Sequence, residues 1–403
     1  MKEEIAAMKT GAVICECNPP HAGHAYLLEQ IKKESDCVVC LMSGHFVQRG
    51  EAAILSPLAR AEILLQMGAD LVLELPFPYA ASSAESFADA GVSILSRLGV
   101  TDLWFGSESG DLDSLSQIAV TAQSQAFRAE YAKRVGEGNI GTAALYFQLL
   151  SDFCGLQKPL SPNDILAVAY LRAIEKEQSN LMPHAVQRVG ADDRDLALEK
   201  RKIPSAAALR KAIFEGKTDV LSAFLPDFDN KILQRERDAG RFPASMNFAS
   251  SAILWGLRQA DPKAFELFAE AGGGVGNRLQ TSANEAADLE TLFSFAATKK
   301  YPNARLRRAL LFLLTGVKKE DLSISPAYVR LYAANEKGRG FLSSVRKTAD
   351  IPVVTSNAGV PNFPAARRQE ELAEKATSLY ALCLPRPTSP AELLRKNPIL
   401  SEK

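Results

Sequence analysis

Apolar residues in the first half of the chain gather in five short runs that amphipathic stretches separate. The runs are nearly continuous, as expected for parallel strands covered by helices on both faces, and they lack the alternation of half-exposed strands. We therefore predict five parallel strands, at residues 12–16, 37–43, 70–75, 102–107 and 184–189.

Two of the intervening stretches have recognisable helix starts. Ser56 and Pro57 offer an N-cap and a first-turn proline before LARAEILLQM. Ser82 and Glu85 form a capping-box pattern before the next apolar-periodic stretch. Strands that alternate with helices predict a doubly wound α/β domain with right-handed crossovers, which we place at residues 1–215.

The second half of the chain has few strand patterns. Amphipathic stretches at 248–260, 285–300 and 304–317 are typical of helices. We therefore expect residues 216–403 to form a second, mainly helical domain, with PRPTSP near the C-terminus in a loose tail.

The overall charge favours no class of partner, because Lys and Arg total 47 and so do Asp and Glu. One window departs from this balance: residues 299–347 hold twelve Lys or Arg against three acidic residues. A solvated helix face gives such a run as readily as a nucleic-acid-binding surface does, so both interpretations stay open.

Other bulk features predict a cytoplasmic protein with no membrane partner. The six cysteines are scattered, and the charged start MKEEIAAMK lacks the apolar stretch of a signal peptide. No apolar run approaches the ~18 residues of a membrane span. The oligomeric state cannot be predicted from the sequence.

Two of the four histidines, His21 and His24, stand three residues apart around Gly23. They follow the first predicted strand, so they lie at the sheet's carboxyl edge, where open α/β sheets bind ligands. Pro19 and Pro20 bar a helix before His21 and favour one after it. A helix start attracts phosphate, and two imidazoles there can donate hydrogen bonds as charge builds at phosphorus.

A structural role and a metal-binding role for this histidine pair also stay open. The histidines can be surface or capping residues with no chemical role, or they can bind zinc together with nearby thiols. Zinc is disfavoured because Cys15 and Cys17 lie along one predicted strand and Cys37 and Cys40 along the next, and not on tight turns. We therefore expect phosphate chemistry and no resident metal.

The motif HAGH after a first strand resembles the signature of the HxGH nucleotidyltransferase superfamily, Rossmann-like enzymes that attack ATP at the α-phosphate and release pyrophosphate. Longer motifs are similar to the bacterial tRNA(Met) cytidine acetate ligase family. They are NPPHAGH, SGHFVQRGEAAILSPLARAEILLQMGADLVLELPFPYA, FADAGVSIL and FGSE, followed by SPNDILAVAYLRAI, QRVGA, SAAALR, YPNARLRRALL and KGRGFL. The resemblance runs from about residue 11 to residue 345.

The resemblance implies a function. Members of this family use ATP to activate acetate as acetyl-adenylate, and then acetylate N4 of the wobble cytidine in elongator tRNA(Met). For this chain it implies ATP, with Mg²⁺, as cosubstrate, and acetate and elongator tRNA(Met) as partners.

The resemblance also implies site residues. Matched by motif, His21 and His24 are catalytic, and both also belong to the ATP site. The ATP site comprises Ile14, Cys15, Glu16, Cys17, Asn18, Pro19, Pro20, His21, Ala22, Gly23, His24, Ala25, Tyr26, Leu27, Gly106, Asn163, Arg188, Ser205 and Arg210.

Some positions depart from the family pattern or suit a purely structural role. The family usually has an aromatic and a larger polar residue where Pro20 and Ala22 stand, and often threonine where Ala207 stands. Ser205 follows Pro204 and begins a helical run, so it is a natural N-cap, and capping alone would account for it.

Residues after the second and third strands are candidates of a looser kind. His45, Gln48 and Arg49 follow the second strand, so their loop can close over the acetate or the incoming cytosine, or can simply pack. Glu74, near the end of the third strand, allows the same two interpretations. We expect His184, at the start of the fifth strand, to be structural.

For the basic window, we expect Arg305 and Arg308 to share one helix face, because they are three residues apart. Lys337 and Arg339 would supply further phosphate contacts from KGRG. These four residues are the predicted tRNA-binding set.

Two further functions remain alternatives. A small-molecule adenylyltransferase shares HxGH chemistry but leaves the helical region and its basic window unexplained. A non-catalytic RNA-binding protein is disfavoured because the residues of both phosphate-binding motifs are intact.

Overall fold

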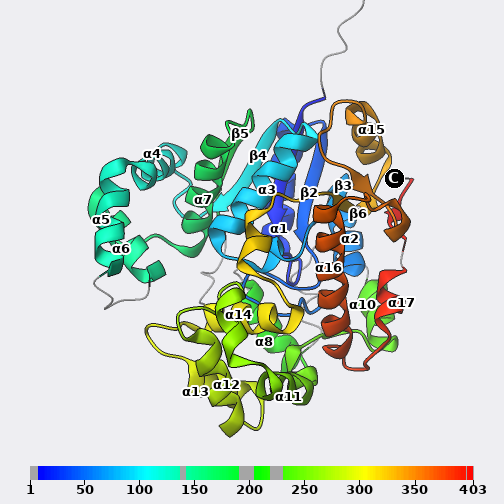
Figure 1. The fold of residues 1–403 in the computed structure, drawn as a ribbon. Coiled ribbons are helices and arrows are strands. Elements are labelled where there is room, and N and C mark those ends of the chain that lie inside the picture. The colour runs from blue at the N-terminus through cyan, green and yellow to red at the C-terminus, as the bar shows by residue number, and fades with distance from the viewer. Residues whose placement is uncertain (1–7, 137–141, 190–203, 218–229, 396, 403) are drawn as a thin grey trace, which may run out of the picture.

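The computed structural model describes residues 8–136, 142–189, 204–217, 230–395 and 397–402. Within these residues the centre is an eight-stranded sheet in the order β5-β4-β1-β2-β3-β6-β7, with β8 paired to β6 (Figure 1). The strands are β1 (Thr10–Cys15), β2 (Cys37–Ser43), β3 (Leu71–Leu75), β4 (Asp102–Ser107), β5 (Met182–Gln187), β6 (Val329–Ala334), β7 (Val353–Val354) and β8 (Ile399–Leu400). The five predicted strands are confirmed, and they pair in parallel.

The order of the parallel strands reverses at β1. Strands β2 and β3 follow on one side of β1, whereas β4 and β5 lie on the other. In open α/β sheets, ligands bind in the crevice outside the carboxyl ends of the strands at such a switch point. The turn after β1 and the end of β4 therefore flank the expected ligand position.

Successive residues of each strand face opposite sides of the sheet, and helices cover both sides. Ile14 packs on the side of α3 (Ala84–Leu98) and α7 (Pro162–Lys176), whereas Val13 packs on the side of α1 (Ala22–Glu34) and α2 (Pro57–Gln66). The predicted doubly wound fold is confirmed.

The helix starts agree with the prediction in one case and differ in the other. The Ser56 hydroxyl accepts the N–H of Ala59 and caps α2, as predicted. The cap of α3 is Ser83, not Ser82. The Ser82 hydroxyl instead donates to the carbonyl of Tyr79, which closes the short η1 turn (Tyr79–Ala81) and moves the helix start by one residue.

Helices dominate the rest of the described chain, and the mainly helical character predicted beyond residue 215 is confirmed (Figure 1). They are α4 (Leu112–Gln123), α5 (Gln125–Gly136), α6 (Thr142–Cys154), α8 (Ala206–Phe214), α10 (Asn230–Asp238), α11 (Ser250–Gln259), α12 (Val275–Glu285), α13 (Leu289–Ala296), α14 (Asn303–Thr315), α15 (Glu336–Val345), α16 (Pro364–Leu382) and α17 (Pro390–Leu394). Residues of α11 to α14 share a buried cluster with α16.

The C-terminal region also contains strands that were not predicted. β6 pairs antiparallel with β3, and β8 pairs with β6, so the expected loose tail returns to the sheet. The sequence VRLYAA is short and lies among helical patterns, which hid it. The boundary at residue 215 stays a prediction, but the segment beyond it completes the sheet of the first region.

The basic window 299–347 divides between two ends of the sheet. Its helix α14 lies against the loop that follows β2, because a Cβ on Gly50 would be 2.6 Å from the Arg308 backbone nitrogen. Its helix α15 lies at the start of β3, where the Asn335 N–H donates to the Asp70 carbonyl. In the described residues, no helix is both long and apolar enough to span a membrane.

Candidate active site

The turn after β1 leads directly into helix α1. Cys17 in this turn has a left-handed φ of 49°, a conformation that non-glycine residues adopt rarely and often at functional sites. His21 is the N-cap of α1, and its Nδ1 accepts the N–H of Gly23 at 3.0 Å. The Nδ1 of His24 accepts the N–H of His21 at 3.3 Å. The two histidines thus form a reciprocal capping box between themselves.

This capping box determines where the two rings carry their protons. A ring nitrogen that accepts an N–H has no proton of its own, so neutral His21 and His24 both carry the proton on Nε2. The pKa of His21 is well below its ordinary value, because burial disfavours the charged ring and His24, Arg188 and Arg210 repel it. At neutral pH His21 is therefore an uncharged N–H donor.

Glu16 connects the turn to the loop after β2. Its Oε1 accepts the N–H of Gln48 at 2.8 Å, and its carbonyl accepts from Arg60 Nη1 at 2.6 Å. The fully buried Arg60 also donates to the carbonyls of Gly44 and Leu55. Burial raises the pKa of the Glu16 carboxyl. These bonds hold the loop at a fixed position beside the histidines.

Asn18 leaves one donor without a partner. Its Oδ1 accepts the N–H of Ile54 at 2.9 Å, which fixes the orientation of the amide, and its carbonyl accepts from Arg210 Nη1 at 2.7 Å. The buried Nδ2 has no hydrogen-bond partner among the described residues, and neither do Gln48 Nε2 and the Tyr170 hydroxyl. Buried polar groups are normally paired, so three unpaired ones beside the histidines indicate a ligand site.

The opposite wall comes from β4, β5 and α7. A Cβ on Gly106 would be 3.2 Å from Arg188 Cγ, so glycine gives the arginine room at this position. Asn163, in the first turn of α7, donates to Glu108 Oε1 at 2.6 Å, and Arg188 Nε lies 3.8 Å from the same oxygen. Glu108 therefore holds Asn163 and Arg188, two of the residues predicted to bind ATP, in place.

Helix α8 brings the last predicted residues to the site. The Ser205 hydroxyl accepts the N–H of Ala208 at 3.1 Å, so its prediction as an N-cap is confirmed. Arg210 reaches the Asn18 carbonyl and lies 3.7 Å from Glu51. The second motif is thus joined to the first, although 192 positions separate Asn18 from Arg210.

These walls enclose an open cavity with an empty volume of about 1360 Å³. The predicted residues that line it are Ile14, Cys15, Glu16, Cys17, Asn18, His21, Gly23, His24, Tyr26, Leu27, Gly106, Asn163 and Arg188. Those that do not are Pro19, Pro20, Ala22, Ala25, Ser205 and Arg210, although Pro204 and Ala206 on either side of Ser205 do. We call this space the histidine cavity.

Several residues of the histidine cavity were missed or predicted only loosely. Gln48 and Arg49 line it, and closure of their loop over a substrate stays a prediction. Tyr170 lines it too, and nothing in the sequence indicated this, because Tyr170 lies in an apolar-periodic run of α7 that is typical of a buried helix face.

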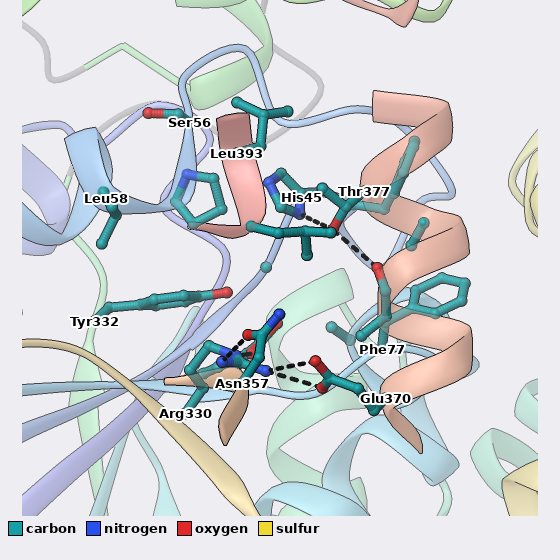
Figure 2. Close-up of a pocket in the computed structure, with 18 of the residues that line it drawn as sticks. His45, Ser56, Leu58, Phe77, Arg330, Tyr332, Asn357, Glu370, Thr377 and Leu393 are labelled. Carbon is teal, nitrogen blue, oxygen red and sulfur yellow. Dashed lines mark hydrogen bonds and ion pairs between the residues drawn. The ribbon is translucent and has the colours of Figure 1, made fainter. Parts of the chain in front are cut away.

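His45 and Glu74 line a different cavity, between the ends of β2 and β3 and helix α16 (Figure 2). His45 Nδ1 lies 3.3 Å from the Thr377 hydroxyl. Arg330 of β6 lies 3.7 Å from Glu74, and its Nη2 donates to both carboxylate oxygens of Glu370 at 3.1 and 2.8 Å. We call this space the Arg330 cavity.

The polar groups of the Arg330 cavity satisfy one another. Arg330 Nη1 also donates to Asn357 Oδ1 at 2.9 Å, and the Tyr332 hydroxyl bonds to Glu74. Burial raises the pKa of the Glu74 carboxyl. Among the described residues, no side chain that lines this cavity has a buried polar atom without a partner.

His184 is placed as expected for a structural residue. Its ring stacks on Trp104 at 4.2 Å between centroids, and its Nε2 lies 2.6 Å from Asp102 Oδ1. Within the described parts of the chain, no three His, Cys, Asp or Glu side chains form a group that could hold a metal.

The predicted tRNA-binding residues do not form one surface. Arg305 and Arg308 do share a face, but both lie against Glu270, at 3.7 and 3.1 Å. Lys337 Nζ reaches the carbonyl of Asp36 and Arg339 that of Ser401, at the amino end of the sheet. Seven-residue β2 separates the two ends by roughly 20 Å, at about 3.3 Å per residue. Whether these four residues contact tRNA stays a prediction.

Comparisons with known proteins agree with this geometry. Residues 8–393 match the family described as HIGH Nucleotidyl Transferase. The tRNA(Met) cytidine acetate ligase of Fervidobacterium nodosum is 35% identical over 362 residues, 87% of this chain and 84% of that protein. The enzyme of the same name from Caldanaerobacter subterraneus subsp. tengcongensis is 35% identical over 385 residues, 93% of this chain and 95% of that protein.

Two solved structures superimpose on the fold. Apo Thermotoga maritima TmcAL gives a TM-score of 0.91 at 30% identity, covering 98% of this chain and 100% of that one. Thermotoga maritima TmcAL bound with alpha-thio ATP gives 0.88 at 29% identity, with the same coverage.

Proposed function

Because the chain belongs to the HIGH nucleotidyl transferase family and, within it, to the tRNA(Met) cytidine acetate ligases, we propose that the histidine cavity is its ATP site and that His21 and His24 are its catalytic residues. The chain is an ATP-dependent ligase that modifies tRNA. We also propose which residues bind ATP, acetyl-adenylate as the intermediate and elongator tRNA(Met) as the tRNA species.

One observation carries the residue assignment: the reciprocal capping box of the two histidines. It places two Nε2–H donors on the first turn of α1, where the backbone N–H groups and the helix dipole already favour phosphate. Donors that are held in place before the reaction stabilise charge that develops in the transition state. This arrangement suits attack at a phosphorus atom.

We propose the following reaction. A carboxylate oxygen of acetate attacks the α-phosphorus of ATP, and the bond to pyrophosphate breaks, which leaves acetyl-adenylate. The N4 amino group of the wobble cytidine of elongator tRNA(Met) then attacks the acetyl carbon, loses a proton and releases AMP. The uncharged ring of His21 and the ring of His24 would donate through Nε2–H to the phosphate oxygens in the first step.

Asn18 Nδ2, Gln48 Nε2 and the Tyr170 hydroxyl would gain partners when ATP and acetate bind. The described residues form no metal-binding group, so a magnesium ion would be held by the triphosphate and water, and no step is assigned to it. Since the substrate is tRNA, we propose that the enzyme acts in the cytoplasm.

The direct test has two parts. Acetate-dependent exchange of pyrophosphate into ATP, without tRNA, measures the first step. Mass spectrometry of nucleosides from tRNA(Met) incubated with ATP and acetate measures N4-acetylcytidine. We expect both signals, and each should vanish when ATP or acetate is omitted. Adenylyl transfer to a small molecule without a carboxylate requirement would contradict the proposal and favour a small-molecule adenylyltransferase.

A further inference from the structure

A third open cavity lies beside the histidine cavity, between α8, α13 and the first half of α14. Charged and aromatic side chains line this cavity, among them Glu51, Arg210, Phe214, Phe293 and Arg307. Its empty volume is about 1340 Å³, similar to that of the histidine cavity. We call it the α14 groove.

One short hairpin separates the α14 groove from the histidine cavity. Phe46 and Ala52 pair across it, and Gly50, at φ +72°, forms its tip against the backbone of α14. Gln48 and Arg49 on this hairpin line the histidine cavity, whereas Glu51 and Ala52 line the groove. A chain lying in the groove would therefore pass within a few residues of the proposed ATP site.

The groove contains cations that a carboxylate holds in place. Glu51 forms an ion pair with Arg307 and lies 3.7 Å from Arg210. Burial lowers the pKa of Arg307, and repulsion from Arg49 lowers it further. Two guanidinium groups that converge on one carboxylate can bind a phosphate in the same way, because both anions accept bidentate hydrogen bonds.

Aromatic rings lie beside these cations. The guanidinium of Arg307 lies 5.3 Å from the centroid of the Phe293 ring, and 34% of the Arg307 side chain is exposed. Phe214, at the end of α8, lines the groove and is 50% exposed. Of the two rings, Phe293 is 9% exposed, and Phe214 is the one open to a base. Arginine near an exposed aromatic ring suits single-stranded nucleic acid, because a base stacks on the ring and phosphates pair with the cations.

We infer that the α14 groove binds the single-stranded RNA next to the acetylated cytidine, with Arg307 on a phosphate and Phe214 against a base. The inference rests on the proposed function, which requires that cytidine to enter the histidine cavity. On α14, Arg305 and Arg308 pair with Glu270 outside the groove, whereas Arg307 pairs with Glu51 and lines the groove. Of the three arginines of this helix, Arg307 is therefore the one assigned to the groove.

The test measures binding of a synthetic RNA with the sequence of the tRNA(Met) anticodon stem-loop, by fluorescence anisotropy without ATP. We expect Arg307→Ala to raise Kd about tenfold and to reduce the slope of log K against log salt by about 0.7, the value for one phosphate contact on a single strand. Phe214→Ala should raise Kd at least fivefold, as loss of one stacked base does.

Matched controls come from the same region. Lys319→Ala removes an equal charge four residues after the end of α14, on the side of Glu266, and Trp255→Ala removes a 68% exposed aromatic ring of α11; neither residue lines the groove. Both should leave Kd within twofold. Arg307→Lys keeps the charge but not the bidentate hydrogen bonds, so it should keep the wild-type salt slope and restore part of the affinity, which separates loss of the contact from damage to the fold.

The outcomes distinguish this inference from the proposed function. Unchanged Kd and salt slope in Arg307→Ala and Phe214→Ala, in protein with wild-type melting temperature, would overturn the groove assignment. An equal loss in Lys319→Ala would overturn it too, since the effect would then be one of general charge. Absence of acetate-dependent pyrophosphate exchange in the unaltered protein would instead contradict the proposed function and would not depend on Arg307.

Discussion

The histidine cavity and the Arg330 cavity lie at the same edge of the same sheet, yet their polar groups are arranged in opposite ways. In the histidine cavity three buried polar atoms, on Asn18, Gln48 and Tyr170, have no partner in the described chain. In the Arg330 cavity, Arg330 contacts both Glu74 and Glu370. Both cavities hold a histidine and a buried carboxylate, so residue types alone do not separate them.

The two cavities differ in what a bound ligand would change. A buried donor without a partner carries a desolvation cost that a bound ligand removes, so such atoms mark the place where a ligand belongs. A network whose members already pair with one another gains little from a ligand, but it joins the elements that carry it. Arg330, Glu74 and Glu370 come from β6, β3 and α16, so the Arg330 cavity joins the C-terminal segment to the sheet.

The largest expected effect concerns the histidine pair. His21→Ala or His24→Ala should slow acetate-dependent AMP formation about a hundred- to thousandfold, because removal of one preorganised donor costs about 3–4 kcal/mol in the transition state. Affinity for tRNA should stay within a few-fold. The matched control is His45→Ala in the Arg330 cavity, whose turnover per folded molecule should not change. Near-normal turnover in both His21→Ala and His24→Ala would remove their catalytic assignment.

The next effect concerns stability. Arg330→Met should lower the free energy of unfolding by about 3 kcal/mol, the lower end for breaking a buried ion pair, because the three charged side chains remain 12–19% exposed. Denaturant titration measures this loss. Activity per folded molecule should be unchanged at a temperature where the variant is folded. A variant as stable as the wild type but inactive would reverse the roles of the two cavities.

Sequence patterns predicted the parallel strands and the histidine pair because both depend on local order along the chain. The reciprocal cap is a local feature too, since His21, Gly23 and His24 are adjacent in the sequence. What the sequence did not predict depends on distant contacts. Strand β6 adds to β3 from more than 250 residues away, and an apolar helix pattern conceals the Tyr170 hydroxyl beside β1.

The basic window shows the same limit. A count of charges identified it, and the spacing of Arg305 and Arg308 correctly placed them on one face. Neither feature could reveal that Glu270 occupies that face, because Glu270 is 35 or more positions earlier in the chain. Neither could show that Arg307, on another face, pairs with Glu51 and lines the α14 groove.

A smaller effect is expected at Asn18, where one substitution separates the role of the unpaired Nδ2 donor from that of the paired Oδ1 acceptor. Asn18→Asp keeps the acceptor for the Ile54 N–H but replaces the unpaired Nδ2 with an oxygen. The KM for ATP in pyrophosphate exchange should rise roughly thirtyfold, since a lost hydrogen bond to a charged group is worth about 2 kcal/mol. The matched change Asn357→Asp keeps the acceptor for Arg330 and should leave this KM unaltered. Equal shifts in both variants would show that the added charge acts at long range.

The smallest effect concerns the pH dependence of stability that Glu74 contributes. Burial raises the pKa of Glu74 above its ordinary value of 4.5, and the nearby Arg330 only partly opposes this. Between 4.5 and the raised value, the folded protein binds more protons at this site than the unfolded chain does. The free energy of unfolding must therefore fall as pH rises through that window, and this contribution is fully lost above the folded-state pKa.

Glu74→Gln replaces the titratable carboxyl with an amide that keeps an oxygen at a similar position. The variant should therefore lack this fall in the free energy of unfolding as pH rises. The difference in the free energy of unfolding, wild type minus variant, should decrease from pH 4.5 upward and become flat above the folded-state pKa. Glu16, whose pKa burial also raises, contributes equally to both proteins and cancels. Each pH unit between the two pKa values corresponds to about 1.4 kcal/mol, so urea titrations at several pH values resolve the trend. A difference that rises with pH would mean that the ion pair with Arg330 outweighs burial, so that the folded-state pKa of Glu74 lies below its ordinary value.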